Sequence, residues 1–148
     1  MAATKEVCVS ERPTRIARGA KEDNGPSTNL AVVRGHLVAQ PTVRVIDRHQ
    51  RATTFDLATL VHGRRVVVPV VALNIDLPVI KTGDEVVAIG HVRRRFFRSG
   101  ARTQSVTEVC ADSIVPASRM TKVEDLFATV TKRVRETRTT KLVKRGGE

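Results

Sequence analysis

The sequence predicts an all-β domain followed by one C-terminal amphipathic α-helix. Between residues 29 and 118, Val, Ile and Thr are dense and the apolar runs are short, a pattern typical of strands. Turn-forming Gly, Pro and Asp residues separate these runs. After residue 118 the apolar residues change to helical spacing. A chain of 148 residues has room for one such domain with tails.

Breaks in the pattern divide the β-region into five predicted strands. They cover residues 30–39, 53–61, 65–73, 85–98 and 103–114, with turns near 47–50 and at 99–100. Pro69 cannot donate to a strand ladder, so we expect the third strand at an edge or at a bulge. Residues 74–81 form a connector that can hold a helical turn. This order is that of a five-stranded OB-fold barrel, although a small open sandwich has the same number of strands.

Residues 119–136 predict the amphipathic helix. Thr121 and Glu124 have the spacing of a capping box, which would start it. One apolar stripe follows at helical spacing: Val123, Leu126, Phe127, Val130 and Val134. This stripe either packs on the barrel or recruits a partner or a second copy. We expect residues 1–28 to form a flexible arm and residues 137–148 to form a basic disordered tail. The OB-fold domain is then predicted to cover residues 29–118.

The chain is strongly basic. Lys and Arg number 26 against 15 acids, which gives a net charge of +11. Such a balance favours a polyanionic partner, because binding phosphates releases condensed counterions. A solvated surface that merely keeps the protein soluble is the alternative.

The sequence lacks the patterns of an enzyme site, and we expect a non-enzymatic protein without cofactor or metal. No glycine-rich stretch precedes Lys-Ser or Lys-Thr, so there is no phosphate-binding loop. The four histidines have no arrangement that would pair one of them with a nucleophile and an orienting acid. Cys8 and Cys110 do not have metal-ligand spacing, and Cys110 is expected to be a buried thiol. No apolar run suits a membrane span or a secretory signal, so we expect no membrane association and a cytoplasmic protein.

Four motifs follow one another in the β-region. They are Asn29, Gly35, Leu37, Pro41 and Arg44; then Phe55, Leu57, Ala58 and Thr59; then Lys81, Gly83, Val86, Gly90 and Arg93; and finally Thr107, Glu108 and Val109. In order and spacing they resemble the bacterial single-stranded DNA-binding protein family. The resemblance implies an OB-fold and a nucleoid-associated role in DNA replication, recombination or repair. It also implies a homo-oligomer, a tetramer with a dimer as the alternative.

The chain also departs from that family. The aromatic residue of the family's third strand is missing from 67–71, and the aromatic near the end of that strand is replaced by Leu73. The family's acidic C-terminal tip is replaced by basic residues. These departures indicate a divergent paralogue. An alternative function is an OB-fold module for protein interaction or oligomerisation, with nucleic-acid binding weak or lost.

Sequence-independent binding of single strands requires aromatic faces for bases and cations for phosphates. Phe97 lies where the resemblance places a base-stacking tryptophan, and strand alternation puts it on one face with Arg93 and Arg95. We expect Phe97 to meet single-stranded DNA or RNA, and Phe96 to join the core. The predicted nucleic-acid-binding residues are Arg93, Arg95, Phe97, Arg98 and Arg102, with Arg34, Arg64 and Arg65 as weaker candidates. Alternatively, these arginines lie on an exposed edge strand, where their charge only prevents aggregation.

In the resembling family the first strand pairs with its copy in a neighbouring subunit. Leu30, Val32 and His36 are therefore the predicted oligomer interface. His36 shares a strand face with Arg34, so it is also a weak candidate for the nucleic-acid site. Phe55 belongs to an apolar strand and is expected in the core.

Overall fold

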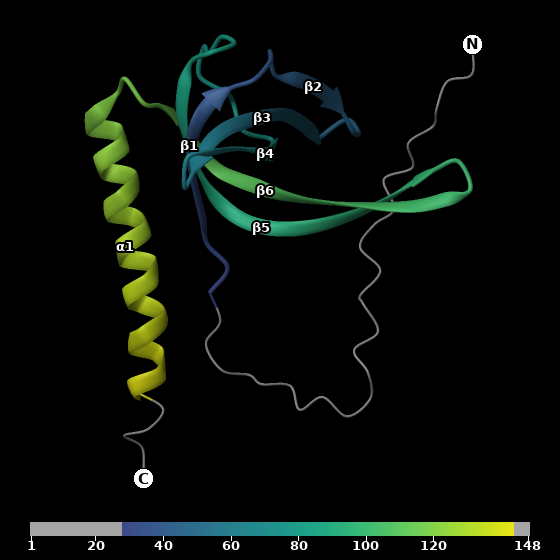
Figure 1. Cartoon of the computed structure of the whole chain (residues 1–148). Helices are drawn as coiled ribbons and strands as arrows, with labels where there is room; N and C mark the ends of the chain where they lie inside the picture. The colour runs from purple at the N-terminus through teal and green to yellow at the C-terminus, as the bar shows by residue number, and fades with distance from the viewer. Residues whose placement is uncertain (1–27, 144–148) are drawn as a thin grey trace, which may run out of the picture.

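The computed structural model describes residues 28–143, with side chains described for residues 28–136. Six strands precede one helix: β1 (Ala31–Leu37), β2 (Thr42–Val45), β3 (Arg51–Val61), β4 (Arg64–Leu73), β5 (Glu85–Ser99), β6 (Arg102–Pro116) and α1 (Met120–Val143) (Figure 1). The predicted arm, apart from Thr28, lies outside the described residues, as does the end of the predicted tail after residue 143.

The strands close into a barrel with the strand order of an OB-fold. The sheet order is β1-β5-β6-β4-β3-β2, and β1 also pairs with β3, which completes the ring. The predicted fold class is thus confirmed. The short β2 was not predicted. It pairs with the start of β3 outside the ring, where residues 46–50 turn the chain back.

Two local expectations have different outcomes. The connector after β4 has no helix, so the predicted helical turn was wrong; irregular backbone fills residues 74–84. Pro69, in contrast, lies where β4 pairs only with β3. Pairing with β6 begins at Val70, so the missing proline N–H falls at an edge of the sheet, as predicted.

The barrel interior is aliphatic. Leu37, Leu57, Val70 and Val86 are almost fully buried, and Phe55 joins them as predicted. Small residues such as Ala88 and Ala111 complete the cluster, which lets strands from opposite sides of a narrow barrel approach. Burial of these side chains drives barrel closure, because each removes apolar surface from water.

Gly90 allows the tightest approach in the barrel. The register between β5 and β6 shifts there, since Ile89 pairs with Ser113 and Gly90 with Ala111. Asp112 is therefore the extra residue of a β-bulge. A Cβ at position 90 would lie 1.9 Å from the carbonyl oxygen of Cys110, so only glycine fits.

α1 packs on the outside of the barrel through its N-terminal half. Val123, Leu126 and Val130 meet a cluster formed by Leu30, Val87, Ile89 and Val115. Arg133 also bonds Asp112 at 3.4 Å, which ties the helix to the bulge. Three residues of the predicted stripe thus pack on the chain's own barrel, whereas Phe127 and Val134 are 45% and 42% exposed.

The ends of α1 differ from the prediction. The helix begins at Met120, and the N–H of Val123 already donates to the carbonyl of Arg119 at 3.1 Å. Thr121 therefore lies inside the first turn and is not the cap. The helix also continues to Val143 and takes up residues 137–143, which were predicted to be part of the tail.

β5 and β6 extend beyond the barrel as a two-stranded hairpin (Figure 1). β1 pairs with β5 only from Glu85 to Gly90, so the later part of β5 has β6 as its one described neighbour. Asn29 holds the start of the projection: its side chain donates to the carbonyl of Val92 at 2.7 Å and accepts from the Val92 N–H at 2.9 Å.

Replacing Gly90 with alanine should destabilise the protein strongly. The added methyl group meets backbone of β6, which cannot rotate away, so we expect a loss of at least about 3 kcal/mol in the free energy of unfolding. Urea denaturation followed by circular dichroism measures it. Gly63→Ala is the control, because Gly63 has a positive φ of 74° but open space around it; its loss should be about 1 kcal/mol. Equal losses would contradict the close approach at Gly90.

Candidate nucleic-acid interface

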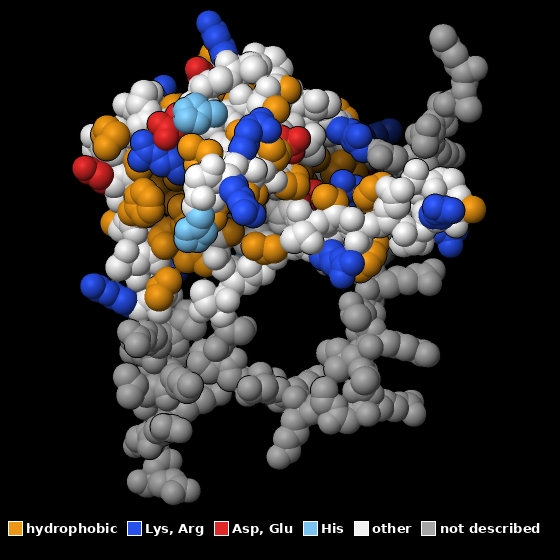
Figure 2. Space-filling model, in the orientation of Figure 1, with side chains coloured by type: hydrophobic (Ala, Val, Ile, Leu, Met, Phe, Trp, Pro, Cys, Tyr) orange, Lys and Arg blue, Asp and Glu red, His pale blue; other side chains and the backbone are white. Residues whose placement is uncertain are grey.

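The projecting hairpin, residues 92–109, has two faces that strand pairing defines. Arg93, Arg95 and Phe97 of β5 pair with Glu108, Val106 and Gln104 of β6, and these six residues form what we call the first face. Arg94, Phe96 and Arg98 pair with Thr107, Ser105 and Thr103, and these six form the second face. Lys and Arg side chains with hydrophobic neighbours follow the hairpin in Figure 2.

Glu108 organises the arginines of the first face. Its side chain is only 5% exposed, and Oε1 accepts from Nε of Arg93 at 2.9 Å. Arg95 reaches the same oxygen with Nε at 3.4 Å. A carboxylate this buried requires cationic partners, because burying it unpaired would cost several kcal/mol. Glu108 therefore holds both guanidinium groups against the sheet.

Arg95 also covers the ring of Phe97. Its guanidinium carbon lies 5.4 Å from the ring centroid, within cation–π range. Phe97 is half-buried. The structure brings Arg93, Arg95 and Phe97 together on one face as predicted from alternation; whether this face binds nucleic acid stays a prediction.

The first face continues onto the barrel. Cys110 follows Glu108 on the same side of β6 and clusters with Val71 of β4. Val67 and Leu73 share the side of β4 that carries Val71. At these two positions, where the resemblance implied aromatic residues, the chain carries aliphatic side chains. Burial raises the pKa of the Cys110 thiol, which keeps this buried cysteine protonated, as expected for an inert thiol.

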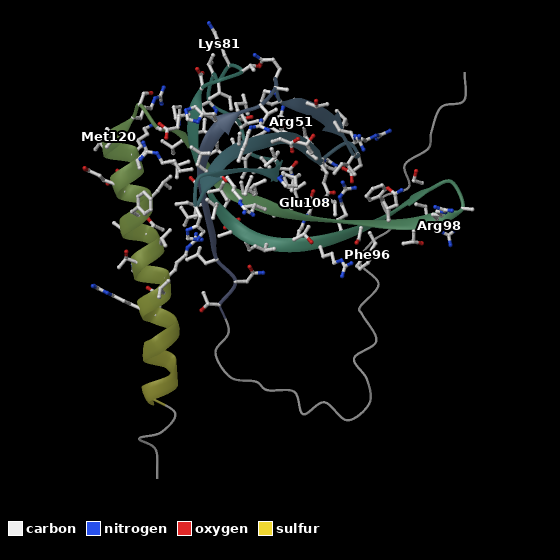
Figure 3. The ribbon with its side chains drawn as sticks, in the orientation of Figure 1. Arg51, Lys81, Phe96, Arg98, Glu108 and Met120 are labelled. Atoms are coloured by element: carbon white, nitrogen blue, oxygen red, sulfur yellow. The ribbon has the colours of Figure 1, made fainter. Side chains whose placement is uncertain are left out.

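Phe96 does not join the core, and this prediction was wrong. Its side chain is 53% exposed on the second face. Along β5, Gly90 and Val92 precede it on the side that faces the barrel interior, but the barrel ends before Phe96 is reached. Figure 3 shows Phe96 and Arg98 on the projecting hairpin, beyond Glu108. The sequence predicted a first strand of residues 30–39, whereas β1 ends at Leu37 and pairs with β5 only as far as Gly90.

The remaining predicted arginines lie at separate places. Arg98 belongs to the second face and is thus separated from Arg93, Arg95 and Phe97, whereas Arg102, which pairs with Ser99, lies on the side of the first face. Arg64 and Arg65 start β4 after a different turn, formed by His62 and Gly63. Arg34 lies on the outer side of β1, opposite Val87 of β5, and is not part of the hairpin surface.

Arg34 pairs with Glu85 instead. Its Nε and Nη2 donate to the two carboxylate oxygens at 2.7 and 3.3 Å. The hydrogen bond from Arg34 holds the pKa of Glu85 below its usual value. This bidentate pair gives Arg34 a role within the sheet, away from the hairpin, and its contact with nucleic acid stays a prediction.

Of the predicted oligomer-interface residues, Leu30 packs against the cluster beneath α1. Val32 and His36 are exposed on the outer side of β1. Leu30 thus has partners within its own chain, and the interface at Val32 and His36 stays a prediction.

Within the described residues, no group of three His, Cys, Asp or Glu side chains is placed to hold a metal ion. Residues 28–143 also include no helix that is both long and apolar enough to cross a membrane.

Comparison with known proteins identifies the fold. No family model matches the chain, and no curated protein does. Among solved structures, the chain is similar to a Plasmodium falciparum SSB in complex with ssDNA, with a TM-score of 0.53 and 15% sequence identity. The match covers 63% of this chain and 97% of that chain. The barrel described above is thus an OB-fold of the kind found in that protein.

Glu108→Gln should lower the free energy of unfolding by about 1–3 kcal/mol, because two arginines lose a charged partner that is itself buried. Urea denaturation measures the change. Asp112→Asn is the matched control on the same strand: Asp112 and Arg133 are each about half-exposed, so this loss should be below about 1 kcal/mol. A Glu108 variant as stable as the control variant would contradict the organising role of Glu108.

The Arg34–Glu85 pair should stabilise the protein in a pH-dependent way. The folded-state pKa of Glu85 is lowered, so its stabilising effect is present above the ordinary value of 4.5 and is lost as the pH falls through the lower folded value. The stability difference between wild type and Arg34→Gln should therefore shrink below pH 4.5. Urea denaturation at pH values on both sides of 4.5 tests this, and a difference that grows in acid would contradict it.

Proposed function

We propose that the protein binds single-stranded DNA without sequence preference, through the first face of its β5–β6 hairpin. The observation that carries the proposal is the placement of Arg93, Arg95 and Phe97 on one face. Single strands are bound by cations that follow the phosphates and by aromatic rings on which bases stack, and this face offers both.

The charge and the fold support the same function. The net charge of +11 favours a polyanion. The Plasmodium falciparum SSB to which the chain is similar in fold was solved in complex with ssDNA, and in this chain the barrel carries the hairpin. Four Phe residues are the only aromatics among Phe, Tyr and Trp, so the stacking contribution is smaller than on an aromatic-rich surface and the electrostatic share is larger.

The biological setting proposed from the family resemblance is DNA replication, recombination or repair in the bacterial cytoplasm. A homo-oligomer joined through the outer side of β1, where Val32 and His36 are exposed, is part of this proposal.

Fluorescence anisotropy of a labelled oligothymidine of ~35 nucleotides, titrated at several salt concentrations, tests the function. Arg95→Ala should weaken binding and reduce the slope of log affinity against log salt by about 0.7, the value for one phosphate contact on a single strand. Phe97→Ala should cost about 1–3 kcal/mol of binding free energy with little change in slope, since stacking releases no counterion.

Lys122→Ala is the charge control, because Lys122 is exposed on α1, away from the hairpin. It should leave the affinity nearly unchanged. If wild type binds only at low salt, and binds duplex as well as single strands, the surface is merely basic and the proposed function fails.

A further inference from the structure

The second face of the hairpin repeats the chemistry of the first. Arg94 lies over the ring of Phe96, with the guanidinium carbon 5.2 Å from the ring centroid. Arg95 and Phe97 show the same arrangement on the first face at 5.4 Å. The Arg-Arg-Phe-Phe order of residues 94–97 thus places one arginine and one aromatic ring on each side of a two-stranded hairpin.

The partners of the arginines differ between the two faces. Arg94 donates from Nε and Nη2 to the hydroxyl oxygen of Ser105 at 3.1 and 2.9 Å, so a neutral group orients it. Within the described residues, the ion pairs of the hairpin arginines involve Glu108 and belong to the first face. The second face has no acid: Arg94, Phe96 and Arg98 stand opposite Thr107, Ser105 and Thr103.

The exposure of Phe96 has no explanation in the packing of the barrel. The ring lies beyond the end of the core, with 53% of its surface in water. Val92, which precedes it on the same side, is 43% exposed. An exposed aromatic ring on a thin hairpin costs solubility. A ring covered by a cation and lined with hydroxyl donors, in contrast, suits a base next to a phosphate.

We propose that single-stranded nucleic acid also contacts this second face, with a base stacked on Phe96 and phosphates at Arg94 and Arg98. The inference rests on the proposed function and extends it: the hairpin is inserted between two segments of bound strand instead of lying beneath one. On the first face, the charge that Arg93 and Arg95 present to a phosphate is reduced by Glu108. On the second face, no carboxylate of the described residues reduces the charge of Arg94.

The absence of Trp and Tyr from the chain allows a direct test. Phe96→Trp and Phe97→Trp each create a protein with a single indole, and base stacking quenches indole fluorescence. Both should be quenched by a saturating oligothymidine of ~35 nucleotides. Phe127→Trp is the matched control, because Phe127 is 45% exposed on α1, away from the hairpin; it should not be quenched.

Affinity measurements on the same oligothymidine complete the test. Phe96→Ala should weaken binding about fivefold or more, corresponding to the loss of one stacked base, and Phe127→Ala should not weaken it. Phe96→Leu should weaken binding to the same degree, because leucine keeps the apolar bulk but has no π-face. Thermal melting of the Phe96 variants should match that of wild type, since the ring is outside the core.

The possible failures are distinguishable. If the wild-type protein does not bind the oligothymidine, the proposed function fails and this inference with it. If the Phe97→Trp variant is quenched but the Phe96→Trp variant is not, and Phe96→Ala binds as wild type does, the second face is refuted while the first stands. Full affinity in Phe96→Leu would overturn base stacking on Phe96.

Discussion

The structure depends on the pairing of one short strand, β1, with two neighbours at once. Its seven residues pair with β5 over most of their length and with β3 at His36 and Leu37. This double pairing needs close backbone approach: a Cβ on Gly35 would lie 2.6 Å from the carbonyl oxygen of Ala58. Glycines at positions 35 and 90 therefore allow the aliphatic core to be enclosed by so few strands.

The shortness of β1 also creates the candidate interface. β5 has 15 residues but β1 pairs with it only up to Gly90, so the rest of β5 leaves the barrel with β6. Both sides of a two-stranded projection are open to solvent. The interface thus results from a mismatch in strand length, and the alternation of Arg and Phe along β5 supplies each side with a cation and a ring.

Glu108 makes the two sides of the hairpin electrostatically unequal. On the first face one buried carboxylate pairs with two arginines, which fixes their positions and reduces the net charge presented to a phosphate. On the second face Arg94 is oriented by the hydroxyl group of Ser105 and keeps its full charge. α1 takes no part in this arrangement, because it packs on the outside of the barrel against β5 and β6, and Arg133 ties it to the β6 bulge.

The sequence by itself determined the five strands of the barrel, the presence of one C-terminal helix and the residues that share a strand face, since these follow from local periodicity. The alternation that groups Arg93 with Phe97 is an example, as is the burial of Phe55. Only the tertiary structure decided what each face meets. Phe96 was expected in the core because alternation placed it opposite Phe97, but where a barrel ends depends on the pairing of distant strands. The pairing of Glu108 with Arg93 likewise needed the register of β5 against β6, which no local pattern encodes.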